Sequence, residues 1–272
     1  MAYGNQRPRI LRIITTLVLT ILAGGLSILA VLSYQSTFGS TDPATCLADH
    51  CFCEAPSLSG LVQPVNTISS LAFVAVGIWI LLTRSEFNKK TKERGLALAF
   101  GIAIVYAGLA SFFYHGTLSF LGQFLDVFSM YVFAILFFIG ALIRRNQIKL
   151  SKAIILFIIL NIIFGLLQYY VPDSRRLVFG LLLIPGLLLE QQPRTTGFGW
   201  FSKQVRYFYI GVGLLTAAYI FWILDDSNTF CVPSSLLQGH AIWHILTAIG
   251  TYMVILHYKH TTHSIKKLES RK

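Results

Sequence analysis

Charged side chains are scarce in this chain. Asp, Glu, Lys and Arg together make up 12% of its 272 residues, whereas about 25% is typical of a soluble domain. The sequence also contains no P-loop, no GxSxG nucleophile elbow, no internal repeat and no long low-complexity tract. These absences argue against a soluble globular enzyme, a P-loop nucleotide-binding protein and a repeat protein.

Long apolar runs dominate instead, and hydrophobic residues make up 55% of the chain. Backbone polar groups must be paired inside lipid, so each run of about 20 apolar residues predicts a membrane-spanning helix. The sixth run is short and contains Pro185. The first run exceeds 20 residues and lacks a small-residue cleavage site, which favours an uncleaved span over a signal peptide. The sequence therefore predicts an all-α polytopic membrane helix bundle with eight spans, at about 10–33, 61–83, 95–114, 118–142, 152–171, 175–190, 206–224 and 236–257.

Basic residues are distributed unevenly around these spans. In the eight-span arrangement, 20 of the 22 Lys and Arg residues lie on one side of the membrane, and only Arg175 and Arg176 lie on the other. The positive-inside rule then places both termini in the cytoplasm. We attribute the formal net charge of +11 to membrane topology, so we expect no nucleic-acid partner. No obligate protein partner is evident.

The four cysteines all fall on the extracytoplasmic side of this arrangement. Cys46, Cys51 and Cys53 lie in the first extracytoplasmic segment, and Cys231 lies in the last one. That side is oxidising in most cells, so we expect a disulfide that involves Cys231. Four cysteines allow three pairings, and some of them could instead be free thiols.

Five polar residues fall at membrane depth, where such groups are costly and usually functional. Ser111 and His115 are four residues apart at the end of the third span, and His240 and His244 have the same spacing at the start of the eighth. Residues at i and i+4 share a helix face. Asp126 lies about two turns into the fourth span. The predicted topology brings all five to a similar depth in the extracytoplasmic half.

Three histidines that leave one position open for water are typical of a catalytic zinc site. Asp126 would serve as a general base or orient a histidine, and Ser111 would donate a hydrogen bond to an oxyanion. Alternatively, the histidines are packing residues, or two of them are haem ligands. We expect the other histidines to lie in solvent or at the interface: His50, His257, His260 and His263.

Several motifs have the spacing of one known family. They are Cys53-Glu54, the segment Asn66 to Ser69, SFFYH with an aspartate eleven residues after His115, Phe230-Cys231, and GHAIWHILTAIGTY. Over about residues 51–257 the chain resembles the alkaline ceramidases, within a superfamily of heptahelical membrane hydrolases that includes adiponectin receptors and Per1-like proteins. That family cleaves the amide bond of ceramide to give a sphingoid base and a fatty acid.

The resemblance implies roles for individual residues. His115, His240 and His244 would bind zinc, Ser111 and Asp126 would assist the reaction, and a disulfide would join Cys53 to Cys231. Because seven spans are usual in the family, 10–33 would be an added helix. The implied division is 1–34 for the N-terminal segment and extra helix, 35–60 for the cysteine-containing loop, 61–257 for a seven-helix hydrolase domain, and 258–272 for a basic tail.

The chain departs from the family next to the cysteines. Alkaline ceramidases have an acidic calcium site around a WCE motif, with a further glutamate before the asparagine. Here Phe52 precedes Cys53, Glu54 is retained, and Gln63 stands at the glutamate position. Calcium prefers several carboxylates, so we expect at most a weak calcium site at Glu54. The resemblance implies that the substrate is ceramide or a related N-acyl lipid. The alternatives are a lipid esterase or phospholipase-like enzyme of the same superfamily, and a receptor with a structural zinc.

Overall fold

The computed structural model of this chain describes residues 7–38, 42–48, 51–87, 92–191 and 203–269. Within these ranges the regular structure is helical, apart from one isolated β-bridge between Pro43 and Ser119. The α-helices are α1 (Arg7–Phe38), α2 (Pro64–Ser69), α3 (Leu71–Thr83), α4 (Lys92–Thr117), α5 (Phe120–Arg144), α6 (Leu150–Tyr170), α7 (Arg175–Gln191), α8 (Lys203–Asp226) and α9 (Gly239–Glu269). Short 3₁₀ helices are η2 (Thr45–Ala48), η3 (Arg84–Glu86) and η4 (Pro172–Ser174).

Seven helical segments in the described ranges are long and apolar enough to cross a membrane. The segment Pro64–Glu86 is one of them, although its helix is interrupted at Ser70 between α2 and α3. The predicted all-α polytopic membrane bundle is therefore confirmed. The predicted sixth span corresponds to α7, whose 17 residues extend about 26 Å, slightly less than the ~30 Å hydrocarbon core. It nevertheless packs on α5 within the bundle.

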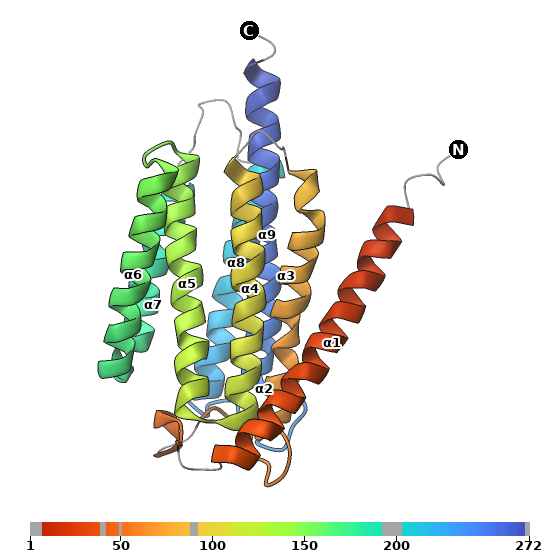
Figure 1. Ribbon diagram of the computed structural model, residues 1–272, viewed down its shortest axis with the longest axis vertical. Helices are drawn as coiled ribbons and strands as arrows, with labels where there is room; N and C mark the ends of the chain where they lie inside the picture. Colours follow the sequence, from red (N-terminus) through yellow and green to blue (C-terminus); the bar gives the residue numbers. More distant parts are fainter. Residues whose placement is uncertain (1–6, 39–41, 49–50, 88–91, 192–202, 270–272) are drawn as a thin grey trace.

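The helices run up and down in a single bundle (Figure 1). Helix α1 begins, and α9 ends, at the same end of this bundle. We call it the α1-start end, and the opposite end the α9-start end. Helices α6 and α7 lie on one flank, while α1 lies on the other and leans away from α3 toward the α1-start end.

The apolar core lies between α4, α5 and α9. Its largest fully buried side chains include Phe100 of α4, Tyr131 of α5 and Tyr258 of α9. By contrast, α1 and α6 expose rows of leucine and isoleucine side chains. An apolar exterior of this kind fits a lipid environment. Burial therefore separates the core helices from those that face lipid.

Glycines allow two helix pairs to approach closely. A Cβ on Gly108 of α4 would lie 2.8 Å from the backbone nitrogen of Val74 in α3. A Cβ on Gly211 of α8 would lie 2.9 Å from the carbonyl oxygen of Gly250 in α9. Small residues are the usual means of close packing between membrane helices. These contacts fix α4 and α9, the two helices that carry the histidines.

A buried ionic cluster occupies the α1-start end. The Arg144 guanidinium lies 2.7 Å from a carboxylate oxygen of Glu190 and 3.7 Å from the centre of the Tyr258 ring. His257 Nε2 lies 3.6 Å from the same Glu190 carboxylate. The expectation that His257 is a solvated histidine is therefore wrong, because the ionic cluster and the ring of Phe208 surround it. His50 and the side chains of His260 and His263 lie outside the described residues.

Candidate metal centre

Three histidines meet inside the bundle at the α9-start end. His115 lies near the end of α4, while His240 and His244 lie in the first turns of α9. All three are buried, and their candidate ligand nitrogens all lie within 4.8 Å of one another. The Nε2 atoms of His115 and His240 are 3.1 Å apart. Residues separated by more than 120 positions in the sequence are thus held as one cluster.

The side chain of Gln63 fixes the tautomer of His115. Its amide nitrogen donates hydrogen bonds to the carbonyl oxygens of Cys51 and Glu54. The amide oxygen therefore faces His115 and accepts from Nδ1–H at 2.8 Å. With the proton on Nδ1, the Nε2 lone pair of neutral His115 points into the cluster.

Ser69 fixes the tautomer of His244 in the same way. The Ser69 hydroxyl donates its one proton to the carbonyl oxygen of Asn66 at 2.8 Å. Its oxygen must then accept from His244 Nδ1–H, which lies 2.8 Å away. His244 therefore also presents an unprotonated Nε2.

His240 is held by its backbone and by an aromatic ring. Its backbone N–H donates to the Asp225 carboxylate at 3.0 Å. The Phe52 ring packs on its imidazole with the ring centres 3.8 Å apart. Its Nδ1 atom is buried and has no hydrogen-bond partner in the described part of the chain. Phe52 adopts a positive φ of 65°, a strained conformation that typically marks functional sites.

These donors fit a tetrahedral metal such as zinc. Zinc–nitrogen bonds of about 2.0–2.1 Å place two ligand nitrogens roughly 3.3 Å apart, close to the 3.1 Å between His115 and His240. Neutral imidazoles with Nε2 free and Nδ1 hydrogen-bonded are the form that binds metal. No other group of three or more His, Cys, Asp or Glu with this proximity occurs among the described residues.

The two polar residues expected beside the histidines also lie here. The Ser111 hydroxyl is 3.3 Å from His244 Nε2 and 3.1 Å from the Ser70 hydroxyl. The half-buried Asp126 of α5 interacts with Ser111 through its carboxylate. The structure thus brings together all five residues that the sequence singled out, from α4, α5 and α9.

Asp225 is a residue whose role the sequence did not reveal. One oxygen of its buried carboxylate accepts from the backbone N–H of His240, and the other accepts from that of Cys53 at 2.9 Å. It therefore caps the start of α9 and attaches the cysteine-containing loop to it. The Cys53–Cys231 disulfide joins the same loop to the segment between α8 and α9, as the resemblance implied, and Cys46 is bonded to Cys51.

Glu54 also caps a helix. Its two carboxylate oxygens accept from the backbone N–H groups of Val65 and Asn66, at 2.7 and 2.8 Å. Burial raises the pKa of Glu54 above its ordinary value; the two backbone hydrogen bonds lower it, and the nearby Asp225 carboxylate raises it. Both oxygens are thus engaged at the start of α2. A weak calcium site at Glu54 stays a prediction.

The ceramidase family model matches residues 51–272, most of the chain. The chain belongs to the ceramidase family. The matched region contains every residue of the histidine cluster, whereas α1 precedes it.

Curated proteins similar to this family member are ceramidases as well. A putative alkaline ceramidase of Dictyostelium discoideum is 26% identical over 223 residues, which is 70% of this chain and 77% of the relative. An alkaline ceramidase of Saccharomyces cerevisiae is 26% identical over 72% of this chain and 70% of its own length. Alkaline ceramidase 3 of Mus musculus is 26% identical over 70% of this chain and 74% of its own length.

Proposed function

We propose that this ceramidase-family protein is a zinc-dependent intramembrane hydrolase that cleaves the amide bond of ceramide or a related N-acyl lipid. The products would be a sphingoid base and a fatty acid. The observation that carries the proposal is the buried cluster of His115, His240 and His244, with two Nε2 lone pairs fixed toward its centre. The names of the curated relatives support ceramide as the substrate class.

His115, His240 and His244 would hold the zinc ion. When bound, zinc would polarise the amide carbonyl and lower the pKa of a water toward ~7. Gln63 and Ser69 keep the His115 and His244 rings in the metal-binding tautomer. Phe52 covers the His240 ring and excludes solvent from that side.

Asp126 would handle the protons of the reaction. Amide hydrolysis adds one water across the C–N bond, so the carbonyl carbon gains an oxygen and the nitrogen gains a proton. The Asp126 carboxylate would take a proton from the water and deliver it to the leaving nitrogen. Ser111, which interacts with Asp126, would donate a hydrogen bond to the carbonyl oxygen as negative charge develops there.

The proposed orientation has both termini in the cytoplasm and the histidine cluster in the extracytoplasmic or lumenal half of the membrane. Both disulfides lie at the α9-start end, which suits an oxidising compartment. Basic residues of the described part of the chain, among them Arg84, Arg144 and Lys149, lie at the other end. We further propose that 61–257 forms the seven-helix hydrolase domain, and that α1 is an addition to it.

A lipid panel tests the proposed reaction. The purified full chain should release fatty acid from ceramide and contain one zinc per chain, while His244→Ala should lose both. His257→Gln alters a buried histidine in the ionic cluster and should keep both, which controls for nonspecific damage. Faster hydrolysis of ester lipids than of ceramide would assign the site to an esterase. Zinc binding without hydrolysis of any lipid would favour a receptor.

A further inference from the structure

A cavity lies at the α1-start end, far from the histidines. Its volume is about 420 Å³, within the range of ligand-binding pockets. It is formed between the start of α1, the end of α3 with η3, and the later turns of α9. His240 and Lys259 are 19 positions apart on α9, so about 28 Å of helix separates the two sites.

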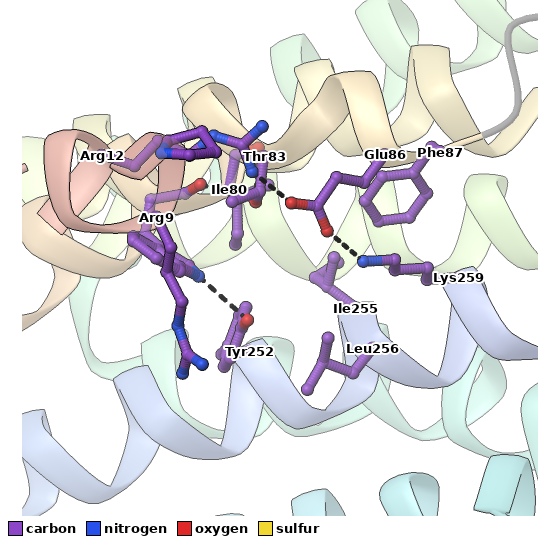
Figure 2. A pocket seen from close by; sticks show the side chains of 12 residues that line it. Arg9, Arg12, Ile80, Thr83, Glu86, Phe87, Tyr252, Ile255, Leu256 and Lys259 are labelled. Carbon is purple, nitrogen blue, oxygen red and sulfur yellow. Dashed lines mark hydrogen bonds and ion pairs between the residues drawn. The ribbon is translucent and has the colours of Figure 1, made fainter. Parts of the chain in front are cut away.

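The charged lining of this cavity is predominantly basic. Arg9, Arg12 and Lys259 face one acidic residue, Glu86, which leaves a formal charge of +2. Glu86 forms ion pairs with both Arg12 and Lys259 (Figure 2), and its side chain remains 38% exposed. Arg9 has no ion pair with the described residues. A site that holds three cations with one carboxylate attracts a further anion.

The remaining walls combine apolar and interfacial side chains. Ile255 and Leu256 of α9 provide apolar surface (Figure 2). Trp79 donates a hydrogen bond to the Tyr252 hydroxyl at 2.9 Å, and tryptophan and tyrosine are enriched where membrane helices meet the headgroups. A molecule with an anionic head and an apolar body would match both parts of the lining.

The two halves of α1 are placed differently against the bundle. Its later half is packed against the bundle, where Val31 is buried and Gln35 donates to the Gly116 carbonyl at 2.9 Å. Toward its start, α1 leans away from α3 (Figure 1). In the proposed orientation the cavity, which α1 lines through Arg9 and Arg12, lies on the side of the cytoplasmic leaflet, which is rich in anionic lipids.

We propose that this cavity binds the phosphate group of an anionic membrane lipid. Arg9, Arg12 and Lys259 bind the phosphate, and the lipid body lies along Ile255 and Leu256. The bound lipid attaches the start of α1 to α3 and α9. Two of the three cations come from α1, which precedes the region matched by the ceramidase family, so the site is an addition to the family's core. Binding here requires no part of the hydrolytic chemistry.

The test measures thermal unfolding of the purified full chain in detergent. Phosphatidylglycerol is the probe, phosphatidylcholine is the zwitterionic comparison, and inorganic phosphate at equal concentration represents the free anion. Phosphatidylglycerol should raise the unfolding temperature, and the other two should not. Arg9→Gln/Arg12→Gln should bind phosphatidylglycerol roughly 25-fold more weakly, at about fivefold per basic residue.

Lys149→Gln/Lys152→Gln is the matched control, because it removes two exposed positive charges from the start of α6. This variant should respond as the unmodified chain does. If the Arg9/Arg12 variant does not fold, Arg9→Gln alone should bind about fivefold more weakly. An undiminished response in the arginine variants, or no response of the unmodified chain, would overturn the site. An equal response to inorganic phosphate would overturn the assignment to a lipid.

Discussion

Replacing Ser69 by alanine removes the acceptor that holds the His244 ring. In the structure the Ser69 oxygen lies 2.8 Å from His244 Nδ1, the Ser70 hydroxyl lies 3.5 Å away, and the His244 ring also hydrogen-bonds to the backbone of Asn66. A buried donor left without a partner costs about 1–3 kcal/mol. Loss of the partner of a metal-binding histidine typically weakens metal affinity about 10–100-fold.

We expect Ser69→Ala to weaken zinc binding about tenfold, which corresponds to roughly 1.4 kcal/mol. The low end of the range applies because Ser70 can replace part of the lost hydrogen bond. The assay is competition for zinc between the purified protein and a chromophoric chelator. Ser69→Thr keeps the hydroxyl and should bind nearly as well as the unmodified chain.

Ser36→Ala is the matched control, since it removes an exposed serine hydroxyl on α1. It should leave the zinc dissociation constant unchanged. If Ser69→Ala binds zinc as tightly as Ser36→Ala does, the Ser69 hydroxyl does not hold the His244 proton on Nδ1, and the inferred role of Ser69 in zinc binding is wrong.

Three further variants test the packing and charge of the fold. Gly108→Ala places a Cβ against the backbone of α3 and should lower the unfolding temperature, whereas Gly180→Ala, which meets nothing within 4 Å, should not. Glu190→Gln removes the nearer of the two carboxylates that pair with buried Arg144 and should destabilise the protein by about 3 kcal/mol in chemical denaturation, because Glu93 still compensates part of the charge. Because the pKa of Glu54 is raised on folding, the folded protein binds the Glu54 proton more tightly than the unfolded chain does. Protonation of Glu54 therefore contributes most to the free energy of unfolding below its ordinary pKa of 4.5, and this contribution is lost as pH rises through the pKa of the folded state. Glu54→Gln should remove this dependence from a series of unfolding temperatures measured between pH 4 and 8, and an unchanged dependence would contradict the assignment.

The polar residues of the histidine cluster could be predicted because they are rare in their surroundings. Ser111, His115, Asp126, His240 and His244 interrupt apolar runs, and the charge distribution places them at one depth. Helix periodicity then gives the i, i+4 pairs a common face. The meeting of these five residues therefore follows from helix periodicity, which relates positions a few residues apart, and from the predicted membrane topology.

The residues that support the cluster could not be predicted in the same way. Gln63 and Ser69 are ordinary polar residues near the start of the predicted span 61–83. Their contacts with the histidines arise only when α2 packs beside α4 and α9. Asp225 and Glu190 lie at the ends of the predicted spans 206–224 and 175–190. The structure shows both to be buried, because side chains from other helices close over them. Such burial depends on tertiary packing rather than on local pattern.

The angle of α1 is likewise a tertiary property. Its apolar length predicts a span, and the arginines before it predict orientation. Neither feature reveals that the start of α1 leans away from α3, or that α1, α3 and α9 line a basic cavity there. The break at Ser70, which separates α2 from α3 within one apolar segment, was also not evident from the sequence.

Zinc content and ceramide hydrolysis, measured on the same purified sample, test the central proposal most directly. We predict one zinc per chain, with fatty acid released from ceramide, loss of release after chelation, and recovery when zinc is restored. The His115→Ala variant should contain no zinc and release no fatty acid. A protein that hydrolyses ceramide without zinc, or a His115→Ala variant that keeps both properties, would contradict the proposed function.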